Sequence, residues 1–188
     1  MTSHPENESG RGWSPWRVAG WGFAALLLLL PAVAMRFTDE VDWTVGDFLI
    51  AALLIGIVGI SFELTVRVTR SGAQRAGVAV ALAASFLTVW ANGAVGMIGN
   101  EDNPYNLLFF GVIGIALLGS VAARFRPAGT AVAMLVAAAA QASLGVVGAF
   151  ADLRGGIFSA MFAGLWLLGA GLVWTARRTI DDAARPSA

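Results

Sequence analysis

Six apolar runs, separated by short polar segments, dominate the chain. Each run has roughly 20 residues, the length at which a helix crosses the hydrocarbon core of a bilayer. The runs cover about residues 17–35, 45–68, 76–98, 105–123, 129–150 and 157–176. We therefore predict an all-α polytopic membrane bundle of six transmembrane helices over residues 17–176, with a disordered tail at 1–16 and a polar tail at 177–188.

The first apolar run has an alternative interpretation as a signal peptide. Arg17 precedes it, and Ala32-Val33-Ala34 near its end fits a cleavage motif. Cleavage after Ala34 would leave five spans. The apolar stretch is longer than the ~7–15 residues of a signal-peptide core, which favours a span that is retained.

The arginines predict the orientation of the spans. Ten of the twelve basic residues fall in the two tails and in the loops after the second and fourth runs. They are Arg11, Arg17, Arg67, Arg70, Arg75, Arg124, Arg126, Arg177, Arg178 and Arg185. The opposite side has only Arg36 and Arg154. Because cytoplasmic segments of membrane proteins are enriched in Arg, both termini are expected in the cytoplasm (N-in, C-in).

Two helical hairpins, about 44–100 and 105–154, resemble each other. The matching segments are 76–82 with 128–134, and 93–96 with 145–148. Both matches have the same offset of 52 residues, which favours duplication over chance similarity of Ala/Gly/Val-rich spans. Both hairpins are expected to begin on the same side, so we predict a parallel duplication with a pseudo-axis along the membrane normal.

Glycines recur at helical spacing in several runs. The sets are Gly56/Gly59, Gly93/Gly96/Gly99, Gly111/Gly114 and Gly145/Gly148, with Ala160/Gly164 as a similar small pair. Small residues let membrane helices approach closely, so these positions are predicted to be helix–helix contacts.

Composition excludes several classes of function. The chain is 57% hydrophobic and 13% charged, against about 45–50% and about 25% for soluble domains. It has no Cys and no Lys, and its single His lies in the N-terminal tail at His4. These absences argue against disulfides, an intramembrane His-ligated haem or zinc and a Schiff-base lysine, and we expect no cofactor. The zero net charge makes nucleic acid an unexpected partner.

Three polar residues inside the runs are candidate sites. Glu63 is a proton or cation site if it is deep in the membrane, or half of an interfacial ion pair with Arg67, four residues later. Its position near the end of the run favours the ion pair. Asn92 and Gln141 are either hydrogen-bonding contacts between helices or the lining of a small polar cavity, and the first use is the commoner one.

The turn after the third run carries Glu101, Asp102 and Asn103. Asn103 followed by Pro104 is typical of a helix start. The two carboxylates with nearby Asn oxygens would also suit a hard cation, but a capped, solvated turn is the favoured interpretation. Residues 90–106, with the flanking spans, resemble a segment of small uncharacterised multi-span membrane proteins of bacteria. This resemblance implies a bacterial membrane protein and no particular activity.

The sequence predicts a non-enzymatic membrane protein, because no nucleophile motif, metal-ligand motif or nucleotide-binding loop appears. A structural or partner-binding subunit is the leading hypothesis, with the lipid bilayer and a second copy or another membrane protein as partners. The alternatives are a transporter or channel for a small solute or ion and, less favoured, a membrane-embedded enzyme. The Arg-only, Ala- and Gly-rich usage favours a bacterial plasma (inner) membrane.

Overall fold

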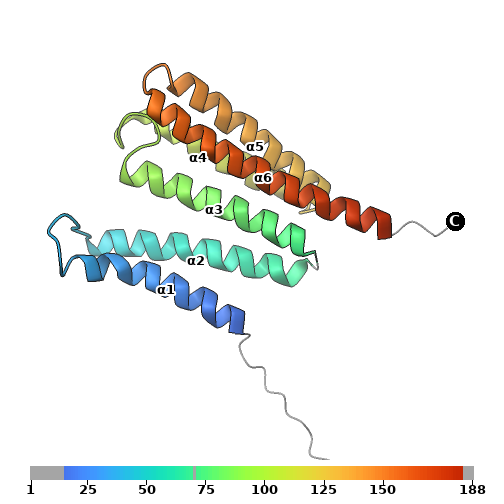
Figure 1. Ribbon diagram of the computed structural model, residues 1–188, viewed down its shortest axis with the longest axis horizontal. Helices are drawn as coiled ribbons and strands as arrows, with labels where there is room; N and C mark the ends of the chain where they lie inside the picture. Colours follow the sequence, from blue (N-terminus) through green and yellow to red (C-terminus); the bar gives the residue numbers. More distant parts are fainter. Residues whose placement is uncertain (1–14, 70, 184–188) are drawn as a thin grey trace, which may run out of the picture. The chain divides into compact units, whose positions relative to one another are not determined.

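The computed structural model describes residues 15–69 and 71–183, and within these ranges it contains helices and no strand. The elements are α1 (Pro15–Ala34), α2 (Val45–Val68), α3 (Gly72–Ala94), the short 3₁₀ helix η1 (Pro104–Leu107), α4 (Leu108–Ala122), α5 (Pro127–Gly148) and α6 (Leu153–Ala183). They are labelled in Figure 1. Six of the described helical segments, η1 and α4 together counting as one, are long and apolar enough to cross a membrane, which confirms the predicted all-α class and the presence of six candidate spans.

Several helix ends differ from the prediction, and α3 and α6 each begin four residues before their predicted spans, at Gly72 and Leu153. Residues 1–14 of the predicted N-terminal tail lie outside the described residues, and α1 starts at Pro15. The third helix ends at Ala94, four residues before the end of its apolar run. The last helix continues past the predicted span to Ala183.

The chain divides into two units, Met1–Gly59 and Ile60–Ala188. In the first, the Trp21 ring packs on Gly59, where a Cβ atom would come within 3.0 Å of the indole. Thr44 caps α2, because its N–H and hydroxyl donate to Asp47 Oδ2 at 2.7 and 2.8 Å, and the Asp47 N–H donates to Thr44 Oγ1. This is the reciprocal capping box expected of Thr followed three residues later by an acid.

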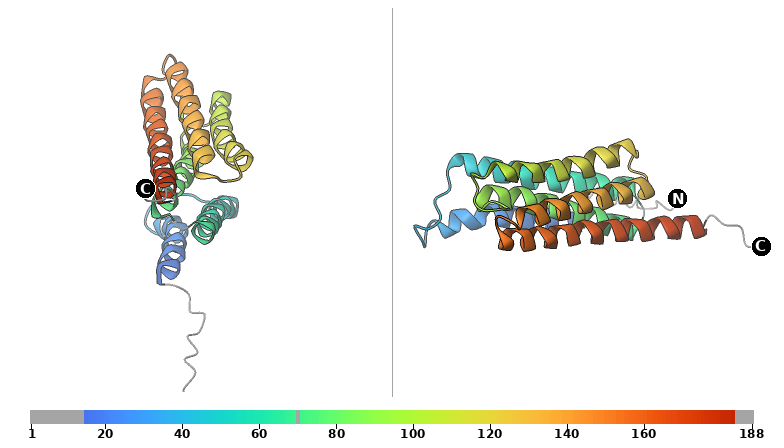
Figure 2. Two further views of the ribbon diagram at one scale, coloured as in Figure 1. Left: turned by 90° about the vertical axis from the view of Figure 1, so that its right-hand side faces the viewer. Right: turned by 90° about the horizontal axis from the view of Figure 1, so that it is seen from above.

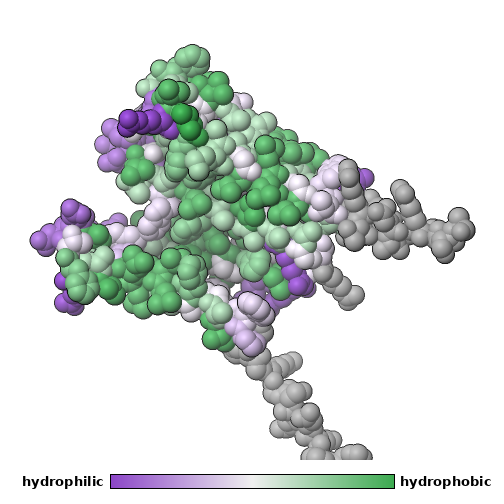
Figure 3. Space-filling view, viewed as in Figure 1, coloured by the Kyte–Doolittle hydropathy of each residue, from purple (hydrophilic) through white to green (hydrophobic). Residues whose placement is uncertain are grey.

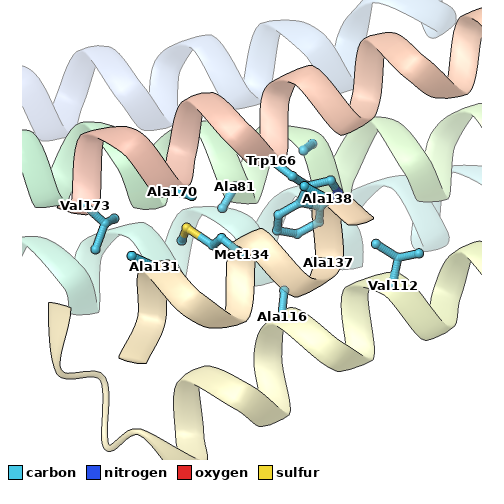
Figure 4. Packing of buried hydrophobic residues seen from close by; sticks show 11 residues of the cluster. Ala81, Val112, Ala116, Ala131, Met134, Ala137, Ala138, Trp166, Ala170 and Val173 are labelled. Atoms are coloured by element: carbon cyan, nitrogen blue, oxygen red, sulfur yellow. The ribbon is translucent and has the colours of Figure 1, made fainter. Parts of the chain in front are cut away.

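In the second unit, α6 packs along both α5 and α3, and α4 packs along α5 (Figure 1, Figure 2). The core between these helices is built mainly from alanine with few large side chains (Figure 4). Its members are Ala81, Ala84, Val112, Ala116, Ala131, Met134, Ala137, Ala138, Trp166, Ala170 and Val173. Small side chains let the helix axes come close together, and the dispersion attraction between the closely packed surfaces drives association in lipid.

A glycine allows α3 and α6 to approach closely. A Cβ atom at Gly77 would lie 2.6 Å from Val173 Cγ2 and 2.7 Å from the Gly169 carbonyl oxygen, so this position has no room for a side chain. Gly145 also lies close to Ser159 of α6, as predicted for a helix contact. Gly111, Gly114 and Gly164 differ, since within the described residues nothing lies within 4 Å of a Cβ built on them.

A single arginine joins α2 to α3. The Arg75 guanidinium donates to the carbonyl oxygens of Val66 at 3.0 Å and of Thr69 at 2.6 and 3.0 Å, which satisfies the last carbonyls of α2. Arg75 therefore has a structural role in addition to its contribution to the charge asymmetry.

The surface shown in Figure 3 is apolar over the sides of the helices, and the hydrophilic side chains gather at helix ends. Membrane-spanning helices have this distribution, because lipid covers their sides and headgroups or water cover their ends.

Candidate functional site

The loop between α3 and α4, residues 95–107, is folded around the side chain of Asn106, which is 3% exposed. Its Oδ1 accepts hydrogen bonds from the N–H groups of Met97 (3.2 Å) and Ile98 (2.8 Å). Its Nδ2 donates to the carbonyl oxygens of Asn100 (2.7 Å) and Ile98 (3.3 Å). One amide thus satisfies backbone groups that have no partner in a helix or sheet, which keeps this α3–α4 loop in one conformation.

Two glycines make this conformation accessible. Gly96 and Gly99 have φ angles of +77° and +75°, the left-handed region that other residues rarely adopt. A Cβ atom at Gly96 would also overlap the Asn100 carbonyl group. The prediction that Gly96 and Gly99 pack between helices is therefore wrong: both lie in the loop, beyond the end of α3, and serve backbone geometry.

Asp152, in the turn before α6, ties the loop to the bundle. Its Oδ2 accepts from the Gly99 N–H at 3.0 Å, and its Oδ1 accepts from the Arg154 N–H at 3.0 Å. The N–H groups of Gly99 and then Gly155 hold the pKa of the Asp152 carboxyl below its ordinary value, because they stabilise the charged form. This carboxylate therefore fixes the loop and the start of α6 together.

Apolar side chains of the loop fill the end of the bundle. Met97 and Ile98 are both 1% exposed. Ile98 lies over two glycines, since a Cβ atom at Gly148 would be 2.6 Å from Ile98 Cδ1 and one at Gly155 would be 3.1 Å from it. The Tyr105 hydroxyl adds a bond of 2.8 Å to the Leu144 carbonyl oxygen of α5. The loop is consequently part of the packed structure.

The predicted polar turn lies at the tip of this loop. Asn103 is committed to the fold, because its Nδ2 donates to the Ile98 carbonyl oxygen and its Oδ1 accepts from the Tyr105 N–H, both at 3.0 Å. This is the cap predicted for Asn103 and Pro104. Asn100, Glu101 and Asp102 are exposed. In the searched part of the chain, residues 15–69 and 71–183, no three side chains of the His, Cys, Asp or Glu type gather as a metal site.

The second group of polar side chains is buried between the helices. Gln141 on α5 donates from Nε2 to Ser159 Oγ of α6 at 3.0 Å, and Ser159 Oγ donates back to the Gln141 carbonyl oxygen at 3.2 Å. Asn92 on α3 instead bonds within its own helix, from Nδ2 to the Thr88 carbonyl oxygen at 2.7 Å. The side-chain amide of Gln141 thus connects two helices, whereas that of Asn92 bonds only within α3.

Glu63 lies far from both amides. It pairs with Arg67 at 2.7 Å, and the two side chains are 24% and 63% exposed. Glu63 is five residues before the end of α2, whereas Asn92 is twenty residues beyond the start of α3 across the same hairpin. At 1.5 Å per residue the two differ in depth by roughly 20 Å. The structure therefore brings Gln141 together with Ser159 but does not bring Glu63 to either amide.

Comparison with protein-family models, curated proteins and solved structures gives no match. Function is therefore inferred from the two polar assemblies of the second unit: the α3–α4 loop with Asp152, and the buried layer around Gln141. Asp152 and Asn106 were missed by the sequence analysis, and the only signal for Asp152 was its place before the start of a helix.

Proposed function

We propose that this chain is a non-catalytic, partner-binding subunit of a bacterial plasma membrane, in which the tip of the α3–α4 loop contacts a membrane protein or a second copy of the chain. The observation that carries the proposal is the contrast within this loop. Its base is fixed by Asn106 and Asp152, while Asn100, Glu101 and Asp102 at its tip are exposed. A recognition surface held in one conformation loses little entropy on binding.

The open glycines give further support. Gly111 and Gly114 of α4 and Gly164 of α6 have no neighbour within 4 Å of a Cβ position in the described residues. Glycine in a membrane helix is stabilising where another helix approaches it closely. A partner helix against α4 or α6 would use these positions as Gly77 is used inside the bundle.

The proposed orientation places both termini in the cytoplasm and the α3–α4 loop outside. It is supported by the ten arginines that lie in the tails and in the loops expected to be cytoplasmic. Reporter fusions within residues 100–103 and after residue 188 test the orientation, and a cytoplasmic signal from the loop would contradict it. The parallel duplication remains part of the proposal, although Val95 and Gly96 lie beyond the end of α3 while the matching Val147 and Gly148 stay helical.

Photo-crosslinking in living cells tests the partner directly. A crosslinking amino acid at Asp102 is expected to give one discrete adduct, whose mass separates a second copy from another protein. The matched control is Val136, which is exposed on the side of α5, a helix on which no partner is proposed.

Loosening the loop gives the second arm of the test. Asn106→Ala should reduce the Asp102 adduct several-fold while the protein stays in the membrane at its usual level. The proposal is wrong if crosslinkers at Asn100, Glu101 and Asp102 all give no discrete adduct, or if Val136 gives the same adduct in the same yield.

A further inference from the structure

Three of the buried polar atoms that lack a hydrogen-bond partner among the described residues belong to α3, α5 and α6: Asn92 Oδ1, Gln141 Oε1 and Trp166 Nε1. Their side chains are 6%, 0% and 1% exposed. In both amides the NH₂ group is already used, by the Thr88 carbonyl oxygen and by Ser159 Oγ. The groups left over are therefore two acceptors and one donor.

The register of the helices places the two amides at one depth. Gln141 lies opposite Ser159, to which it is hydrogen bonded. Gly77 of α3 lies against Gly169 and Val173 of the antiparallel α6. Asn92 is fifteen residues beyond Gly77, and fifteen residues back along α6 are positions 154–158. Asn92 therefore lies within about one helical turn of the level of Ser159.

The indole of Trp166 extends toward the same level. Long side chains in a helix lean toward the N-terminus of that helix, which for Trp166 is the direction of Ser159. Figure 4 shows the Trp166 ring in the core next to Ala138, and Ala138 is one turn before Gln141 in α5. By this register the indole N–H and the two amide oxygens lie at a similar depth among α3, α5 and α6.

We propose that this layer is a binding site for one internal water molecule. Water accepts a hydrogen bond from Trp166 Nε1–H and donates one to Gln141 Oε1 and one to Asn92 Oδ1, so a single molecule satisfies all three groups. The groups around the site are amide, hydroxyl and indole, which suits an uncharged ligand. Buried water characteristically makes about three hydrogen bonds to polar groups that lack protein partners. The bound water links three helices that make few direct polar contacts with one another.

Vibrational spectroscopy of the full-length protein in lipid nanodiscs tests the site. The ultraviolet resonance Raman difference between wild type and Trp166→Phe isolates the Trp166 indole, whose N–H-sensitive band should take the hydrogen-bonded position. Infrared difference spectra between H₂¹⁶O and H₂¹⁸O should contain an isotope-shifted O–H stretch of a buried water. Gln141→Met and Asn92→Leu should each lose or shift this stretch.

Two controls keep the test specific. Trp174→Phe removes a different indole from α6 and should leave the Trp166 band in place. Ser143→Ala removes an exposed α5 hydroxyl that bonds to the Ala139 carbonyl oxygen of its own helix, and it should leave the water stretch unchanged. If one of the Gln141 and Asn92 variants fails to fold, the other variant and the difference between wild type and Trp166→Phe still decide the matter.

A Trp166 indole band at the free, non-bonded position in the wild type would overturn the proposal. A bonded indole without any isotope-shifted stretch that responds to Gln141→Met or Asn92→Leu would overturn it as well, since the indole would then bond directly to a protein group. Neither outcome bears on partner binding by the α3–α4 loop, which is measured by crosslinking.

Discussion

Asn106→Ala should release the α3–α4 loop from the bundle without unfolding the spans. The substitution removes four hydrogen bonds, of which those to Ile98 N–H (2.8 Å) and the Asn100 carbonyl oxygen (2.7 Å) are short. Each hydrogen bond contributes about 0.5–1.5 kcal/mol net, and the two longer bonds count for less, so the loop should lose roughly 2–4 kcal/mol of local stability. Met97 and Ile98 are buried in this loop, so water cannot replace Asn106 Oδ1 as the acceptor for their N–H groups.

Hydrogen–deuterium exchange of the peptide covering residues 95–107 measures this loss. A decrease of 2–4 kcal/mol corresponds to roughly 30- to 700-fold faster exchange at the Ile98 amide, since about 1.4 kcal/mol is a factor of ten. Peptides from the middle of α5 should exchange as in the wild type, because the loop opens locally. Asn106→Asp should give an intermediate effect: it keeps the two acceptor bonds but turns an oxygen toward the carbonyl oxygens of Ile98 and Asn100.

Asn100→Ala is the matched control, in the same loop and with the same residue type. The Asn100 side chain is exposed, and only its backbone carbonyl oxygen takes part in the bonds described for the loop. Its removal should change stability by no more than about 0.5 kcal/mol. Unchanged exchange at Ile98 in Asn106→Ala would refute the reasoning, because apolar packing of Met97 and Ile98 would then be sufficient to hold the loop.

Three further results are expected. The pKa of Asp152 is lowered in the folded protein, so its contribution to stability is present above the ordinary Asp value of about 3.9 and is lost as the pH falls through the folded value. Hydrogen exchange in the loop should therefore accelerate in this acid range in the wild type and should not respond to it in Asp152→Asn. An acid profile of Asp152→Asn equal to that of the wild type would contradict the assignment. Gly77→Ala should lower the free energy of unfolding by about 1–3 kcal/mol because its Cβ meets Val173, whereas Gly56→Ala, with open space around it, should stay within about 0.5 kcal/mol. Equal effects would show that the approach of α3 to α6 is looser than described. Glu63→Gln should lower the free energy of unfolding, measured by chemical denaturation, by about 0–1 kcal/mol, since the Arg67 side chain is largely exposed. A loss above about 3 kcal/mol would show that the ion pair is buried.

The sequence predicted features that depend on local spacing. Span length follows from the thickness of a bilayer core, the Thr44–Asp47 cap from a three-residue spacing, and the Glu63–Arg67 pair from the four-residue spacing of neighbours on a helix. In each case the interacting groups are close in sequence, so the backbone geometry of one helix is sufficient to bring them together.

The loop was not predictable in this way. Met97 and Ile98 extend the apolar run of α3, and hydropathy alone cannot separate a residue that faces lipid from one that is buried in a folded loop. The bond from Gly99 to Asp152 joins residues 53 positions apart, and its formation requires the register of α3 against α6. The predicted helix contacts at Gly96 and Gly99 failed for the same reason, because regular spacing of glycine does not reveal that the helix has already ended at Ala94.

The two polar assemblies depend on the same helix packing. Asp152 precedes α6 and fixes the loop, while Ser159, two turns into the same helix, holds Gln141. Gly145, Gly148 and Gly155 make this possible, since a side chain at any of them would collide with Ser159, Ile98 or the Met97 carbonyl oxygen. A shift of α6 against α5 would therefore disturb the buried layer and the loop together. Because the loop tip is the proposed contact surface, the close packing of α5 and α6 determines the geometry that a partner meets.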